Sequence, residues 1–213
     1  EKVRSIVTND KIGGLILMQD DAAREITLVN EFQQKSKVPL MIGMDAEWGL
    51  YQRIAAAHKF PWAMTLGAIQ DKSLIEKMSA KIAEDCHRMG INWDFAPVVD
   101  VNTNPNNPII GNRSFGSEVS NVVNSASAYA NGLQNNSILA AIKHFPGHGD
   151  TSTDSHTDLP VVAHNLERLN NVELAPFKTL MNKGIGGVMV AHLYVPALEP
   201  NKGIPASVSK NII

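Results

Sequence analysis

The chain has 213 residues, of which 44% are hydrophobic and 19% are charged, and its formal net charge at pH 7 is −2. This length and this composition are typical of one globular domain with a sizeable core. The sequence contains no basic stripe and no apolar run of roughly 18 residues, so we expect neither a nucleic-acid partner nor a membrane span.

Short apolar runs alternate with longer amphipathic stretches along the chain. We predict strands at residues 13–18, 38–45, 92–100, 139–144 and 187–192. We predict helices at residues 1–9, 21–36, 73–89, 119–134 and 166–183. The single cysteine, Cys86, lies in one of these helices and is expected to be buried. Continuous apolar strands that alternate with helices indicate an α/β fold with a parallel sheet covered on both faces.

Polar residues follow the predicted strands at the points where those strands end. The clearest examples are Asp45, Glu47 and Arg53, then Asp100, the segment 143–156 and His192. Strand ends that all supply one site are typical of a (β/α)8 TIM-type barrel or of a doubly wound sheet. The glycine-rich nucleotide fingerprint of the doubly wound fold follows none of the strands, so we favour the barrel.

The segment 143–158 concentrates one lysine, three histidines and three aspartates in 16 residues. One interpretation is a metal site, with ligands drawn from His144, His148, Asp150, Asp154 and His156. Their spacing matches no compact metal motif, and His144 and His148 would share a face only on a helix, which the nearby proline and glycines oppose. We therefore expect no catalytic metal.

The same segment also suits acid–base chemistry on a sugar. The Asp154 carboxylate can fix the tautomer of His156 and raise its basicity, since the two residues are two positions apart. Lys143 and His144, at a strand end, can donate hydrogen bonds to hydroxyl groups. The alternative is a solvated polar loop without a chemical role.

A resemblance to a known family rests on this segment. The run from Lys143 to Asp150, KHFPGHGD, followed by the Asp-Ser-His run at 154–156, resembles the signature of glycoside hydrolase family 3, in its β-N-acetylhexosaminidase branch. Further segments that are similar to the family lie in the same order at residues 13–18, 43–47, 95–101, 110–116 and 205–209. The resemblance implies that residues 1–213 are one partial catalytic barrel domain, comprising about strands two to six of eight.

The resemblance also implies roles for individual residues. His156 would be the general acid/base, with Asp154 orienting it. The residues implied to hold the terminal sugar are Asp45, Arg113, Lys143 and His144, with Arg53 supporting them from behind. The roles of His192 and Trp48 are left open. His192 is either a substrate contact or a structural or solvated side chain, and Trp48 is either part of the core or an aromatic platform for the sugar.

The implied activity is removal of terminal β-linked N-acetylglucosamine by an exo-acting retaining hydrolase, with peptidoglycan fragments as the carbohydrate substrate and no cofactor. In this family the nucleophile is an aspartate on the strand that would follow Ile213, so we expect residues 1–213 alone to be inactive and expect a fused C-terminal domain. The alternatives are a catalytically silent sugar-binding scaffold, a β-glucosidase and a glycoside phosphorylase. The sequence leaves the compartment open between the bacterial cytoplasm and the periplasm or cell envelope.

Overall fold

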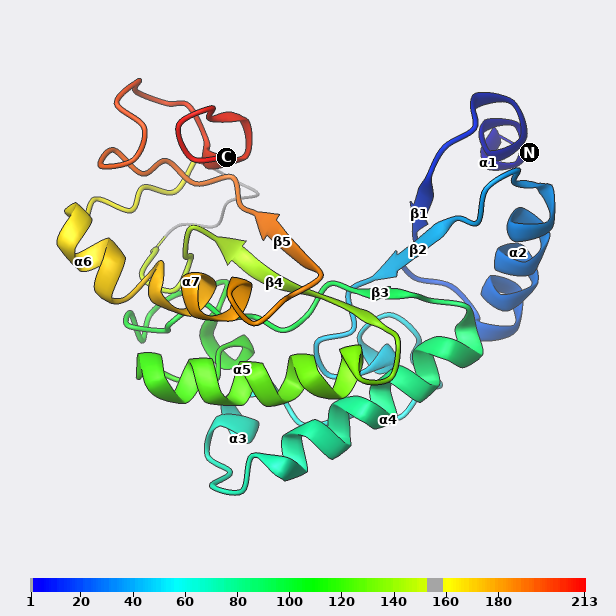
Figure 1. Cartoon of the computed structure of the whole chain (residues 1–213), viewed down its shortest axis with the longest axis horizontal. Helices are drawn as coiled ribbons and strands as arrows, with labels where there is room; N and C mark the ends of the chain where they lie inside the picture. The colour runs from blue at the N-terminus through cyan, green and yellow to red at the C-terminus, as the bar shows by residue number, and fades with distance from the viewer. Residues whose placement is uncertain (1, 153–158) are drawn as a thin grey trace.

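The computed structural model describes residues 2–152 and 159–213. Five strands form one parallel sheet, and their order in the sheet is their order in the chain (Figure 1). The strands are β1 (Gly14–Ile16), β2 (Met41–Met44), β3 (Trp93–Asp94), β4 (Leu139–Phe145) and β5 (Gly187–Val190). A doubly wound sheet reverses its strand order at a switch point, and the strands of the described residues show no reversal. The five strands therefore form a half-barrel, which confirms the predicted fold class in its incomplete form.

Helices cover the outer, convex side of this curved sheet, where α2, α4, α5 and α7 lie in Figure 1. The α-helices are α1 (Lys2–Ser5), α2 (Ala22–Lys35), α3 (Ala63–Gly67), α4 (Ser73–Met89), α5 (Val119–Gln134), α6 (Leu166–Asn171) and α7 (Ala175–Met181). Short helices of other types are η1 (Ile6–Asp10), η2 (Leu50–Gln52), η3 (Gly111–Arg113) and η4 (Ala206–Val208). Among the described residues, none of the helices has the length and apolar character needed to cross a bilayer.

Helices α4 and α5 begin and end at the predicted residues, but the predicted helix at 166–183 is wrong as a single element. It is divided into α6 and α7 because Val172 leaves the helical conformation, with φ −124° and ψ −70°. Pro176 then lies in the first turn of α7, where the missing amide hydrogen costs nothing. The observed β2 and β3 are also shorter than the predicted strands, although each lies within its predicted range.

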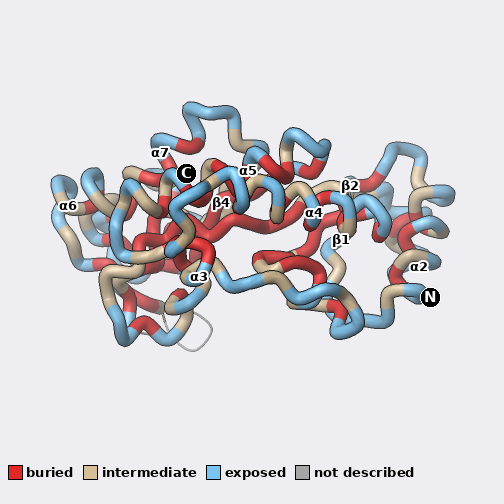
Figure 2. The backbone as a smooth tube through the Cα atoms, turned by 90° about the horizontal axis from the view of Figure 1, so that it is seen from below, coloured by how far each residue is buried: buried red, intermediate tan, exposed pale blue. Residues whose placement is uncertain are grey.

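The main core lies between the sheet and helices α4 and α5, and the buried backbone runs through the middle of the molecule in Figure 2. The two helices pack closely at Gly132, where a Cβ atom would lie 2.0 Å from the Ser79 hydroxyl oxygen and 2.3 Å from the Glu76 carbonyl oxygen. Only glycine permits this approach. Cys86 is fully buried in this core, as predicted, and burial raises the pKa of its thiol.

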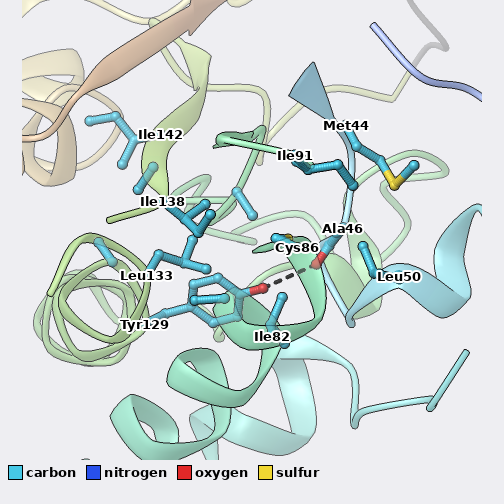
Figure 3. Close-up of a cluster of buried hydrophobic side chains, with 14 of the residues drawn as sticks. Met44, Ala46, Leu50, Ile82, Cys86, Ile91, Tyr129, Leu133, Ile138 and Ile142 are labelled. Carbon is cyan, nitrogen blue, oxygen red and sulfur yellow. Dashed lines mark hydrogen bonds between the residues drawn. The ribbon is translucent and has the colours of Figure 1, made fainter. Parts of the chain in front are cut away.

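Tyr129 connects the core to the residues that follow β2. Its side chain is buried on α5, and its hydroxyl group donates to the carbonyl oxygens of Ala46 and Glu47, each at 3.1 Å. Figure 3 shows the bond to Ala46 within the surrounding apolar side chains. The helix therefore holds the backbone next to Asp45 in place.

Replacing Tyr129 by phenylalanine is expected to lower the free energy of unfolding by about 1–2 kcal/mol, because two buried carbonyl oxygens lose a donor while the ring packing stays. Urea denaturation of the two proteins measures this difference. Tyr51→Phe, which changes an exposed tyrosine, is the matched control and is expected to change stability by less than about 0.5 kcal/mol. Equal stability losses in the two variants would contradict the role given to the Tyr129 hydroxyl.

Candidate active site

A pocket of about 350 Å³ lies where strands β2, β4 and β5 end, near the lower limit of the size range of small-molecule sites. All five residues predicted to hold or support the sugar line this pocket, namely Asp45, Arg53, Arg113, Lys143 and His144. The other described residues that line it are Glu47, Gln52, Ile109, His148, the segment 189–191 and His192. Asp154 and His156, the predicted catalytic pair, lie outside the described residues, so their roles stay predictions.

The Lys143 ammonium group is the centre of the charged network in the pocket. Lys143 is only 1% exposed, and its Nζ atom lies 2.7 Å from Asp45 Oδ1 and 2.8 Å from Glu47 Oε1. Arg53 donates from Nη2 to the other oxygen of Asp45, at 2.6 Å. Asp45 is therefore shared between Lys143 and Arg53, and Glu47 is shared between Lys143 and Arg113, which fixes the orientation of each carboxylate.

Burial and charge act in opposite directions on the two carboxylates that Lys143 contacts. Burial alone would raise the pKa of Glu47, but the charges of Lys143 and Arg113 outweigh it and hold the pKa at about 2. In the same way, burial opposes and the charges of Lys143 and Arg53 lower the pKa of Asp45 below its ordinary value. Both groups are therefore ionised at neutral pH and accept hydrogen bonds only.

Arg113 connects this network to His144. Its Nε and Nη2 atoms donate to the two oxygens of Glu47 at 2.9 and 2.6 Å, in a bidentate pair. Nη2 also lies 3.2 Å from His144 Nε2. Because a guanidinium group can only donate, His144 Nε2 must accept, and its proton resides on Nδ1.

Asp100 supports this assignment from behind His144. The carboxylate is fully buried, and Oδ2 accepts from His144 Nδ1 at 2.7 Å. Its oxygens also accept the backbone N–H groups of His144 at 3.2 Å and of His148 at 2.7 Å. Burial would raise the pKa of Asp100, but His144 and these hydrogen bonds lower it. Asp100 is thus an ionised group that holds the loop after β4 and orients the His144 ring.

The expectation that His144 and His148 cannot face each other without a helix is wrong. The ring centroids are 6.1 Å apart in an edge-to-face arrangement, because the chain turns after β4 and Asp100 binds both residues. His148 is buried, its Nδ1 atom lies 2.5 Å from Thr151 Oγ1, and burial lowers the pKa of its imidazole. His148 therefore contributes a neutral wall to the pocket.

The sequence motifs assign no role to two residues of the site, although both lie at or just after the end of a predicted strand. Glu47 lies two positions after Asp45, and Asp100 ends the predicted strand at 92–100.

Of the residues whose role the sequence leaves open, His192 lines the pocket, and its Nδ1 atom lies 2.5 Å from the hydroxyl oxygen of Ser207. Trp48 stacks on Trp62 with ring centroids 4.5 Å apart, and Trp62 is 36% exposed.

Asp94 lies beneath the charged network, at the end of β3. Its side chain is fully buried; Oδ1 accepts the Ala46 N–H at 3.0 Å, and Oδ2 has no hydrogen-bond partner among the described residues. Burial, and to a smaller extent the neighbouring carboxylates of Asp45 and Glu47, raise the pKa of Asp94, while the Ala46 hydrogen bond and Lys143 oppose the shift, and the net pKa is about 7. Asp94 therefore changes its charge near neutral pH.

The Asp94→Asn variant is expected to be more stable than the wild type. The difference between their free energies of unfolding is expected to grow by about 2 kcal/mol from about pH 5.5 to about pH 8. The pKa of Asp94 is raised on folding, so its ionisation lowers the wild-type unfolding free energy as the pH rises towards 7. Asparagine has no proton to lose. The groups with lowered pKa values, such as Glu47, lose their contribution only at acidic pH.

Urea denaturation of both proteins across this pH range measures the difference. Groups common to the two proteins, including the histidines, cancel in the comparison. A stability difference that stays constant with pH would contradict the proposed titration of Asp94.

Comparisons with known proteins agree with this architecture. The model of the glycosyl hydrolase family 3 N-terminal domain matches residues 1–213. The chain is 37% identical to beta-hexosaminidase A of Pseudoalteromonas piscicida, over 94% of this chain and 36% of the relative. It is 35% identical to beta-hexosaminidase LpqI of Mycobacterium tuberculosis, over 97% of this chain and 54% of the relative. The chain thus spans between about a third and about half of the length of these relatives.

Solved structures agree as well. A family 3 β-N-acetylglucosaminidase from Paenibacillus sp. FPU-7 superposes with a TM-score of 0.95 and 39% identity, covering 100% of this chain and 42% of that one. NagZ from Neisseria gonorrhoeae, in complex with N-trifluoroacetyl-D-glucosamine, gives a TM-score of 0.91 and 30% identity, covering 100% of this chain and 65% of that one. The fold, the order of the strands and the match along all 213 residues lead to one conclusion. The chain belongs to glycosyl hydrolase family 3, as an N-terminal domain of that family.

Proposed function

We propose that the complete gene product is an exo-acting retaining β-N-acetylglucosaminidase. The observation that carries this proposal is the charge balance of the network that the pocket residues form together with Asp100, the buried carboxylate behind His144. Among the described residues of the network, the carboxylates are Asp45, Glu47 and Asp100, and the cations are Arg53, Arg113 and Lys143. A network with balanced charges suits a neutral ligand with many hydroxyl groups, because it offers oriented donors and acceptors without attracting an ion.

Four partly exposed side chains in the pocket are able to form hydrogen bonds with the hydroxyl groups of a ligand. Asp45, Arg53, Arg113 and His144 are each between 15% and 22% exposed at the side chain, whereas Lys143 is buried. A site that hydrogen-bonds a hydroxyl group rejects analogues that lack it, because its own polar groups are then left unpaired. We assign these four residues, held by Lys143 and Glu47, to the terminal sugar.

The chemical steps rest on the sequence motif at 154–156. His156 protonates the leaving glycosidic oxygen and then removes a proton from the attacking water, while Asp154 orients the imidazole. The ordinary pKa of histidine, about 6.5, already suits both steps near neutral pH. The nucleophile is assigned to an aspartate beyond Ile213, and the covalent glycosyl intermediate on it makes the enzyme a retaining one.

The choice of N-acetylglucosamine draws on the relatives, which are named beta-hexosaminidases and a β-N-acetylglucosaminidase. We assign the substrate to carbohydrate chains that end in β-linked N-acetylglucosamine, such as peptidoglycan fragments. The relatives also include a beta-N-acetylglucosaminidase/beta-glucosidase from Cellulomonas fimi, which is 30% identical over 87% of this chain. The sugar preference therefore needs a direct comparison.

The test is an assay of the complete gene product on matched aryl β-N-acetylglucosaminide and aryl β-glucoside, each with and without inorganic phosphate. The expected result is hydrolysis of the first substrate, independent of phosphate and lost in His156→Ala. His58→Ala, which changes an exposed histidine, is the control and is expected to keep the activity. An inactive wild type or an active His156→Ala variant would overturn the assignment, and release of a sugar phosphate would identify a phosphorylase.

A further inference from the structure

A second group of titratable side chains lies apart from the pocket lining. Asp150, His164 and Glu173 each offer one ligand atom, and these atoms all lie within 4.8 Å of one another. None of the three is among the residues that line the pocket. They come from three segments: Asp150 follows the turn after β4, His164 precedes α6, and Glu173 lies between α6 and α7.

Glu173 is the member of this group that is hardest to explain without a ligand. The residue is only 4% exposed. Its Oε1 atom accepts from Arg168 Nε at 3.3 Å and Nη2 at 3.2 Å, but the buried Oε2 atom has no hydrogen-bond partner among the described residues. Leaving a buried carboxylate oxygen unsatisfied is costly, so this oxygen calls for a cation or a donor.

The position of the Glu173 side chain is fixed by its surroundings. Gly147 packs directly on it, since a Cβ atom at residue 147 would lie 2.8 Å from Glu173 Cβ. Asp150 and His164 contact each other through Oδ2 and Nε2, so the imidazole nitrogen is already directed at a carboxylate. Two carboxylates and one imidazole thus converge, with the single charge of Arg168 beside them. This leaves a net negative charge when His164 is neutral.

We propose that Asp150, His164 and Glu173 bind a divalent transition-metal ion, with Zn²⁺ as the best match. One imidazole nitrogen and two carboxylate oxygens form a donor set that zinc accepts, whereas magnesium and calcium prefer oxygen ligands alone. The metal replaces the proton between His164 and Asp150 and gives Glu173 Oε2 its missing partner. Bound there, the ion joins the end of the β4 turn to the segments around α6.

The proposed metal site is separate from the sugar pocket, and it does not depend on the proposed glycosidase activity. Its ligands differ from the residues assigned to the sugar and to acid–base catalysis. Because only a neutral imidazole can bind a metal ion, protons compete with the metal for His164, and affinity is expected to fall as the pH is lowered.

The test is a titration of the chelator-treated complete gene product with Zn²⁺ by isothermal calorimetry near neutral pH. All titrations use a His156→Ala background, so that zinc cannot bind to the predicted catalytic histidine. The expected result is one zinc per chain, with the Kd raised at least about tenfold by Glu173→Gln and by His164→Gln. His58→Gln, in the same background, is the matched control and is expected to leave the Kd unchanged.

A position measurement that needs no variant at this site keeps the test decisive if the variants fold poorly. Anomalous diffraction from zinc-soaked crystals of the His156→Ala protein is expected to show a peak about 2.0–2.2 Å from ligand atoms of Asp150, His164 and Glu173. Failure to bind zinc, equal affinity in the Glu173→Gln and His164→Gln variants, or a zinc peak only at other residues would overturn the proposal.

Discussion

Replacing Lys143 by methionine is expected to lower the free energy of unfolding by about 3–5 kcal/mol, the usual cost of removing one partner from a buried ion pair. Methionine preserves the length and most of the volume of the side chain but leaves Asp45 and Glu47 without their shared cation. Arg53 and Arg113 still hold one carboxylate each. The remaining loss comes from two negative charges that face each other around an apolar side chain.

The same substitution is expected to lower kcat/KM for the aryl β-N-acetylglucosaminide by at least about a hundredfold, because the Asp45 carboxylate that we assign to the sugar is no longer held in place. Steady-state kinetics and urea denaturation measure the two effects. Lys72→Met is the matched control, since Lys72 donates to the carbonyl oxygens of Gly67 and Ile69 and does not line the pocket. It is expected to lose stability without a comparable loss of activity.

A double variant separates charge from packing. If the unpaired charge of Glu47 causes the instability, Lys143→Met combined with Glu47→Gln should recover part of the unfolding free energy that Lys143→Met loses. Activity should stay low in the double variant, because the network that we assign to sugar binding is still incomplete. If the stability loss of the double variant equals the sum of the losses of Lys143→Met and Glu47→Gln, Lys143 and Glu47 do not interact energetically.

Replacing Asp100 by asparagine is expected to lower kcat/KM by about 10- to 100-fold, mainly through an increase in KM. The carboxylate accepts from three N–H groups of His144 and His148, and the asparagine amide offers only one oxygen for them. If the amide nitrogen faces His144 Nδ1, the imidazole proton must move to Nε2. It then points at the Arg113 guanidinium group, which also donates.

The tautomer of His144 is therefore the readout that separates this role from a general loss of structure. In the wild type, ¹⁵N chemical shifts are expected to show the proton on Nδ1, and in Asp100→Asn they are expected to show it on Nε2. Asp85→Asn, which changes a carboxylate on α4, is the control for both kinetics and tautomer. An unchanged His144 tautomer together with unchanged KM would contradict the positioning role of Asp100.

Much of the fold follows from local patterns in the sequence. Helices α4 and α5 have long amphipathic patterns, and their bounds could be predicted to the residue. The sequence does not predict the interruption between α6 and α7, because hydrophobic periodicity continues across Val172 and only Pro176 indicates a new start. The sequence favours the barrel over a doubly wound sheet. The strand order that decides between them depends on which strands pair in three dimensions, and local sequence patterns do not show this pairing.

The candidate site, like the fold, could be predicted from the sequence only in part. Polar residues at strand ends indicate which side chains meet, and the five predicted sugar-binding residues do line one pocket. The sequence does not indicate that Glu47 bridges Lys143 and Arg113, or that Asp100 selects the tautomer of His144. Such pairings depend on distances between strands, and no local pattern records them.

The ion pairs of the pocket also have a consequence for how this protein folds. They join residues 66 positions apart, in the case of Glu47 and Arg113, and 98 positions apart, in the case of Asp45 and Lys143. Contacts of high sequence separation are slow to form, because the chain must lose the entropy of closing a long loop. Because β3 lies between β2 and β4 in the sheet, the pocket is complete only when all three strands are paired, and a nascent chain that ends before Lys143 holds Asp45 and Glu47 without their shared cation. Ligand binding should thus report the completion of folding.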